Sequence, residues 1–155
     1  MREYLFRGKR TDNGEWVAGR LLADDVIVPS GQSFSIDEGI YSEPSDLENL
    51  IMYEVDKNTV GQYTGLVDRN GNKVFEGDIL RIYKNMSGMG DYYYPPLEYP
   101  VPVVVRWDLC AWCWETFTEE DKYYIHFPDA WCHYECEVIG NEFDNPELMK
   151  GSECR

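Results

Sequence analysis

TVGQYTGL at residues 59–66 and FEGDILR at residues 75–81 are the parts of the sequence that say most about the fold. Both read as strands that carry glycines at fixed offsets. Between them lies Asn70-Gly71, a dipeptide that tolerates positive φ at both central positions of a tight hairpin turn. Gly77 falls in a bend, where we expect a backbone angle that a Cβ would forbid. The block therefore predicts paired strands joined by a tight turn and a tight bend.

The remainder of the chain continues this succession of short strands and turns. Asn13-Gly14 separates extended segments at residues 4–10 and 15–22 and predicts a first hairpin. Asn145-Pro146 resembles the start of a single helical turn. Many short strands with frequent turns predict a mainly β protein, a small barrel-like or sandwich domain of antiparallel strands with long loops and at most short helical turns. Further strands are expected at 26–28, 52–56, 101–107, 111–117, 123–127 and 134–139.

We expect one domain over residues 1–155, with a loop inserted at 85–100 and a frayed tail at 150–155. Pro102 indicates that its strand lies at an edge or enters through a bulge. Replacement of Gly61 or Gly65 is expected to harm folding, because the block depends on its backbone geometry. Nine side chains are predicted to form the core, at roughly 1.5–3 kcal/mol for each one buried: Phe6, Trp16, Val60, Tyr63, Ile79, Val105, Trp107, Val138 and Ile139.

The charge of the chain is strongly negative and unevenly spread. Fourteen basic and 29 acidic side chains give a formal charge of −15. Residues 1–22 have a net charge of +2, whereas residues 107–155 have a net charge of −9. Because phosphate affinity depends on clustered Lys and Arg, no direct nucleic-acid binding is expected. Two interpretations of the negative charge stay open: a surface charge that only keeps the protein soluble, or an acidic face that binds a basic partner.

No segment approaches the roughly 18 apolar residues of a membrane span, and no long apolar run follows the first residues. We therefore expect no membrane association and no signal peptide. A cytoplasmic protein is the expectation that follows.

Several motifs together resemble those of a known family. They are YxFRGK at 4–9, WVxG at 16–19, TVGQYTGLxDxNGxK at 59–73, FEGDI at 75–79, VxW at 105–107 and EVIGNxFDNPEL at 137–148. In order and spacing they resemble the YopX family of phage and prophage proteins. The resemblance implies a small, mainly β protein of phage or prophage origin, hence the cytoplasm of a bacterial host, and it implies no catalytic residues. The loop at 85–100 and the cysteine-rich stretch at 110–136 lie outside it.

Four cysteines, Cys110, Cys113, Cys132 and Cys136, have a spacing that could hold a tetrahedral zinc ion. Against zinc, Trp112 lies in an apparent strand, where residues three apart point to opposite faces. Free cysteine also packs well as a small buried hydrophobe. Buried thiols are therefore the favoured reading, over zinc, a disulfide or a redox role, and no metal or cofactor is expected.

The other groups of potentially reactive side chains are explained more simply by local structure than by catalysis. Glu76 and Asp78 flank Gly77 and could share acid–base work, but a turn before a strand favours the same residues for backbone reasons. The two histidines, His126 and His133, lie beside no recognisable nucleophile turn. We expect a protein that is not an enzyme. A small metal-dependent or hydrolytic enzyme, or a zinc-stabilised domain, is an alternative.

The loop Tyr92-Tyr93-Tyr94-Pro95-Pro96 is the best binding candidate in the sequence. Tyrosine offers a rigid face with a hydroxyl, and two prolines reduce the entropy lost on docking. The alternative is that these rings cover one end of a barrel.

The predicted function is that of an accessory protein acting through protein contacts. A homo-oligomer is expected, because exposed edge strands and a basic start against an acidic end favour self-association. An acidic decoy that mimics nucleic acid and occupies the DNA-binding surface of a host protein is the other hypothesis.

Overall fold

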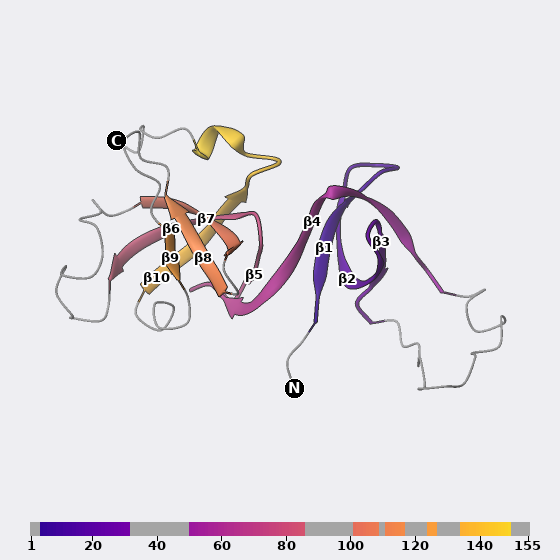
Figure 1. Cartoon of the computed structure of the whole chain (residues 1–155), viewed down its shortest axis with the longest axis horizontal. Coiled ribbons are helices and arrows are strands. Elements are labelled where there is room, and N and C mark those ends of the chain that lie inside the picture. The colour runs from indigo at the N-terminus through magenta and orange to yellow at the C-terminus, as the bar shows by residue number, and fades with distance from the viewer. Residues whose placement is uncertain are drawn as a thin grey trace. The chain divides into compact units, whose positions relative to one another are not determined.

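The computed structural model describes residues 4–31, 50–85, 101–108, 111–116, 124–126 and 134–149. Within these ranges the protein is built from antiparallel strands and one short 3₁₀ helix, which confirms the mainly β prediction (Figure 1). In chain order the elements are β1 (Phe6–Arg10), β2 (Trp16–Ala23), β3 (Val26–Pro29), β4 (Tyr53–Val67), β5 (Lys73–Phe75), β6 (Asp78–Asn85), β7 (Val101–Asp108), β8 (Ala111–Thr116), β9 (Tyr124–His126), β10 (Tyr134–Asn141) and the 3₁₀ helix (Pro146–Met149).

The chain divides into two compact units, Met1–Tyr63 and Thr64–Arg155. The expectation of a single domain over residues 1–155 stays a prediction. Among the described residues, no helix has the length and apolar character needed to cross a bilayer.

In the first unit, four strands close into a ring. They follow the order β1-β2-β3-β4, and β1 also pairs with β4. The predicted hairpin at Asn13-Gly14 is confirmed, because Lys9 lies opposite Trp16 and Gly14 has a φ of 73°. Since β1 has a partner on both sides, this ring leaves β1 without an open edge over the paired residues.

Two glycines allow the strands of this ring to approach closely. A Cβ on Gly8 would lie 2.9 Å from the Cβ of Val55, and a Cβ on Gly19 would overlap the carbonyl oxygen of Val28. Val28 and Val55 are both buried, as is Ile27 between them in the ring. The glycines of the FRGK and WVxG motifs are therefore explained by packing.

The strand β4 is one continuous strand of 15 residues, which joins the predicted strand at 52–56 to the predicted extended stretch from residue 59. Its first part pairs with β1 and β3, and its second part adjoins β5 beyond the Asn70-Gly71 turn. Gly71 has a φ of 84°, so the second predicted hairpin is also confirmed. Gly65 has a φ of 89° within β4, which any other residue would adopt only with strain.

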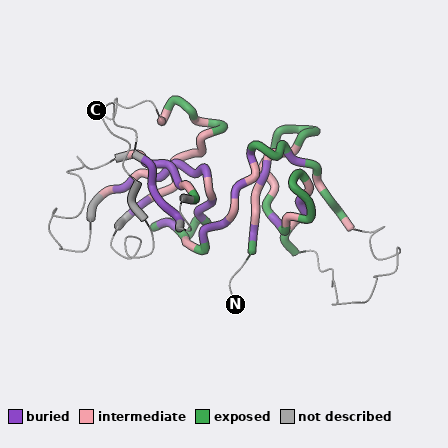
Figure 2. Tube along the Cα trace, viewed as in Figure 1, coloured by how far each residue is buried: buried purple, intermediate pink, exposed green. Residues whose placement is uncertain are grey.

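The second unit contains an antiparallel sheet in the order β10-β6-β7-β8-β9. Most of its buried apolar cluster lies at alternate positions of the strands, which share one face of the sheet. Figure 2 colours the buried positions purple. The cluster consists of Val74, Leu80, Ile82, Val103, Val105, Trp112, Trp114 and Cys136, with Leu66 and Val138 packed against it.

The edge position predicted from Pro102 is wrong, because β7 lies between β6 and β8. Pro102 is the second residue of β7 and stands opposite Arg81. The following run, Val103, Val104 and Val105, is fully buried. A strand whose consecutive side chains are all buried must be covered on both faces, which outweighs the missing N–H of one proline near its start.

The predicted core is confirmed at Tyr63, Ile79 and Val105, which are buried. Val138 is partly buried and packs against the cluster. Four further predicted positions are only partly buried, namely Phe6, Trp16, Val60 and Ile139.

The prediction is wrong for Trp107, which is 51% exposed. Trp107 stands one residue pair from the end of the β7–β8 hairpin, where Asp108 lies opposite Ala111. There the ring has a neighbour on the strand beside it, but its outer side is in contact with water.

Candidate functional site

Trp107 is the most exposed aromatic side chain described in the second unit. Its ring lies edge-on to Trp112, with ring centroids 4.9 Å apart and an interplanar angle of 74°. The two residues are directly opposite in the β7–β8 pair. Trp112 is 6% exposed, and no described residue accepts a hydrogen bond from its indole N–H. A buried tryptophan therefore supports the exposed ring and fixes its orientation.

The opposite face of β7 carries a charged cluster. Arg106 binds Glu142 through both carboxylate oxygens, with one N–O distance of 2.7 Å, and binds Glu115 at 3.2 Å. The hydrogen bond with Glu142 outweighs burial and raises the pKa of Arg106. Side chains alternate along a strand, so Arg106 and Trp107 point to opposite faces. The cluster ties β7 to the end of β10.

Gly77 explains why the bend between β5 and β6 has no side chain. Its φ is 80°, and an added Cβ would lie 2.9 Å from Oε1 of Glu142. The Gly77 N–H donates to the carbonyl of Val105, and its carbonyl accepts from the N–H of Glu142, both at 3.0 Å. Asp78 is buried and accepts the N–H of Phe75 at 2.8 Å. The FEGDI and EVIGN motifs therefore meet in space and hold one another.

Asp68 organises the turn between β4 and β5, and the sequence pattern alone did not single it out. It is 5% exposed, and one carboxylate oxygen accepts the N–H groups of Asn70 and Asn72, each at 2.8 Å. The other oxygen accepts the Asn72 side-chain amide and the N–H of Val138, each at 3.0 Å. Burial alone would raise the pKa of Asp68, but these hydrogen bonds outweigh it and lower the pKa. The sequence signal that could have identified this role is an acidic residue two positions before Asn-Gly.

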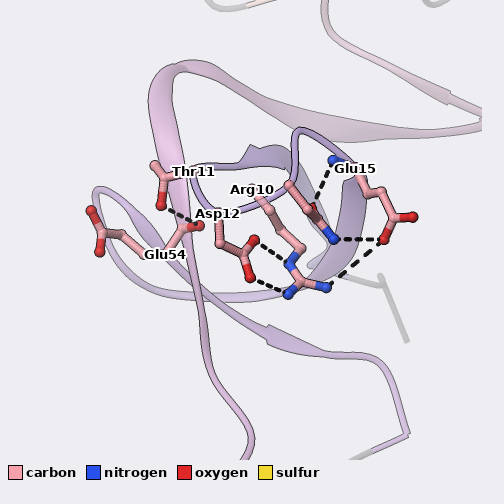
Figure 3. A network of polar contacts seen from close by, with 6 residues as sticks. Arg10, Thr11, Asp12, Glu15 and Glu54 are labelled. Atoms are coloured by element: carbon pink, nitrogen blue, oxygen red, sulfur yellow. Dashed lines mark hydrogen bonds and ion pairs between the residues drawn. The ribbon is translucent and has the colours of Figure 1, made fainter.

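In the first unit, the arginines of the basic cluster at residues 7–10 pack on aromatic rings. The Arg10 guanidinium lies 3.9 Å from the ring centroid of Tyr53, and that of Arg7 lies 4.8 Å from Trp16. Arg10 also donates to Asp12 at 2.9 and 2.5 Å (Figure 3). The cluster is therefore engaged in contacts within its own unit.

The two described cysteines lie on opposite faces of their sheet. Cys136 packs with Trp112 and Trp114, and Cys113 lies between these two tryptophans on β8. Because neighbouring residues of a strand alternate, Cys113 points away from Cys136, and the two cannot bind one ion. Both are buried and form no disulfide within the described residues, and burial together with the charge of Asp68 raises the pKa of Cys136 to about 12.

Two of the four zinc candidates, Cys110 and Cys132, lie outside the described residues. Within the described ranges, no three His, Cys, Asp or Glu side chains are grouped so that they could hold a metal ion. The expectation of no cofactor stays a prediction.

The predicted binding loop at Tyr92, Tyr93, Tyr94, Pro95 and Pro96 also lies outside the described residues. Its role therefore stays a prediction.

Together, the strands, tight turns and exposed tryptophan define a small, mainly β protein with a candidate protein-contact surface. The chain belongs to the YopX family, because it matches the family described as YopX protein over residues 5–150. A solved structure, the crystal structure of protein EF1440 from Enterococcus faecalis, is 22% identical, with a TM-score of 0.47, and the match covers 97% of this chain and 100% of that chain. A comparison with curated proteins yields no match.

Proposed function

We propose that this protein is a non-enzymatic accessory protein of a phage or prophage that acts in the bacterial cytoplasm through protein contacts. The observation that carries the proposal is the exposed ring of Trp107, supported from the side by Trp112. Tryptophan is enriched among the few residues that contribute most of the binding energy of protein interfaces.

The geometry favours binding for an entropic reason as well. A side chain that is already ordered loses less conformational freedom when a partner covers it. The edge-to-face contact with Trp112 supplies this order before binding. Trp107 is therefore the anchor that we assign to the contact, and a second copy of this chain is the first partner to test.

The experiment compares Trp107→Ala with Tyr4→Ala, because both positions are exposed aromatics, at 51% and 68%. Sedimentation velocity over a concentration series measures self-association, and capture from a bacterial host lysate measures binding to other proteins. We expect Trp107→Ala to lose association while Tyr4→Ala retains it, and both variants to keep their strand signal in circular dichroism. Unchanged association of Trp107→Ala in both assays would contradict the proposal.

A further inference from the structure

The turn between β4 and β5 covers the outer edge of β10. Among the described strands, β10 pairs with β6 on one side only. On its other side, the Arg69 N–H donates to the carbonyl of Cys136, and the Val138 N–H donates to the carboxylate of Asp68, both at 3.0 Å. The turn thus offers one donor to Cys136 and one acceptor to Val138, two residues further on. A neighbouring antiparallel strand would supply the same pair of hydrogen bonds.

One carboxylate both shapes this turn and holds it on the edge. Besides Val138, Asp68 accepts hydrogen bonds from the N–H groups of Asn70 and Asn72 and from the Asn72 side chain. The turn therefore holds the edge of β10 through hydrogen bonds, while its flanking residues Leu66 and Val74 share the apolar cluster with Cys136 and Val138. On its other side β10 pairs with β6 from Tyr134 to Asn141.

The charge at this edge selects the kind of strand that could replace the turn. Glu137 lies between Cys136 and Val138, where its carboxylate accepts from the side chains of Asn70 at 3.3 Å and Tyr83 at 2.6 Å. Displacement of the turn would remove the Asn70 contact and leave a carboxylate beside the open edge. A basic side chain on an incoming strand would then lie opposite an acidic one, which is a favourable cross-strand pair.

A second copy of β10 is a poor occupant by the same argument. Its sequence carries Glu135 and Glu137 at alternate positions, so antiparallel pairing of two β10 strands centred on Cys136 would place these like charges opposite one another.

We propose that β10 is a strand-acceptor edge, covered at rest by the Asp68 turn, which takes an extended peptide segment with Lys or Arg opposite Glu137. Such an edge binds through main-chain hydrogen bonds and gains specificity from alternate side chains. This surface is separate from Trp107, and the proposal does not depend on that contact.

The first test measures binding of a labelled peptide, TVKVKV, to the full chain by fluorescence anisotropy. Asp68→Ala opens the edge, so TVKVKV should bind this variant about tenfold tighter than it binds the wild type. Asp12→Ala is the matched control, since Asp12 precedes the other Asn-Gly turn, and it should bind as the wild type does. Adding Glu137→Lys to Asp68→Ala should abolish the gain, and the acidic peptide TVEVEV should show none. The proposal is overturned if folded Asp68→Ala binds TVKVKV no tighter than the wild type, or binds TVEVEV equally well.

The second test uses hydrogen exchange in the wild-type protein and so does not depend on a variant that folds. The amides of Arg69 and Val138 should exchange through one shared local opening, at a lower free energy than the amides of Leu80 and Val105. Saturating TVKVKV should protect Val138 while it exposes Arg69, because the peptide replaces the turn. Exchange of both amides only through global unfolding, with or without peptide, would rule the proposal out.

Discussion

The two Asn-Gly turns share a glycine with positive φ, but Asp12 directly precedes its Asn-Gly pair and Asp68 lies two residues before the other. Gly14 and Gly71 have φ values of 73° and 84°, and neither would place an added Cβ within 4 Å of another atom. Each turn follows an aspartate. The Asp12 side chain is 61% exposed and pairs with Arg10, whereas Asp68 is buried and reaches across to Val138.

This difference separates the features of a turn that its own backbone requires from those that depend on a neighbouring strand. A glycine in a positive-φ position is required by the backbone wherever the turn closes, because a Cβ is disfavoured there. The role of Asp68 is partly local and partly tertiary, because its carboxylate accepts hydrogen bonds from Asn70 and Asn72 in its own turn and from Val138 on β10. Beside β10 Asp68 satisfies amide groups, whereas Asp12 in the first unit meets a guanidinium at the surface.

Asp68→Ala is expected to have the largest effect on stability. It removes four accepted hydrogen bonds and leaves the Val138 N–H without its acceptor. We expect a loss of about 3 kcal/mol in the free energy of unfolding, measured by urea denaturation. Asp12→Ala should leave the urea midpoint unchanged, because its ion pair is exposed. Equal losses in the two variants would remove the distinction between the turns.

Gly77→Ala tests a glycine that has both a positive φ and a close neighbour. We expect a loss of about 2 kcal/mol, because the backbone is strained and the new Cβ meets Glu142, whose carboxylate is held by Arg106. Gly71→Ala carries the backbone strain alone and should cost about 1 kcal/mol. Thermal unfolding of the two variants side by side measures the difference. A greater loss in Gly71→Ala would show that the contact with Glu142 is unimportant.

The pH dependence of stability should separate Asp68 from Asp12. The folded-state pKa of Asp68 lies below its unfolded value of about 3.9, so its contribution is complete above that value and is lost as the pH falls through the folded pKa. The stability difference between wild type and Asp68→Ala should therefore shrink below about pH 4. It should persist at high salt, because Asp68 is buried. The pKa of Asp12 is also lowered, by its hydrogen bond with Arg10, but salt should weaken that effect. A difference that stays constant down to pH 2 would contradict this assignment.

The smallest expected effect concerns Cys136, which lies beneath the Asp68 turn. Its pKa of about 12 predicts almost no alkylation of the folded protein at pH 8. Burial is the main cause and the charge of Asp68 is the lesser one, so Asp68→Ala should lower the pKa slightly and Asp12→Ala should not. Peptide mapping by mass spectrometry after alkylation distinguishes Cys136 from the other cysteines. Rapid alkylation of Cys136 in the folded wild type would contradict its burial.

Much of the secondary structure could be predicted, because hairpin turns and short strands have local signals. Both Asn-Gly turns, the bend at Gly77 and the final helical turn were predicted correctly. Local signals also indicated both stretches of β4, at 52–56 and from residue 59, which form one strand in the structure. The strand is continuous because pairing with β1, β3 and then β5 supports the whole length.

The surface was harder to predict than the strands. Trp107 has a large apolar side chain of the kind expected in a core, but its position at the end of a hairpin exposes it. The cysteine spacing could suggest a shared metal, whereas strand alternation separates Cys113 from Cys136. Neither outcome can be worked out from spacing alone, because the first depends on where the β7–β8 hairpin ends and the second on which face of the sheet each cysteine occupies.

The amino-acid sequence was sufficient to predict the strand content and the places of the tight turns, and it carries the match to the YopX family. Strands and turns depend on backbone angles and on the alternation of side chains, which each short segment specifies on its own. Three further features became known from the folded chain: Asp68 closes the edge of β10, Gly77 lies against Glu142 and Trp107 faces water. These contacts join residues far apart in the chain, and their energies exist only when the strands are already side by side.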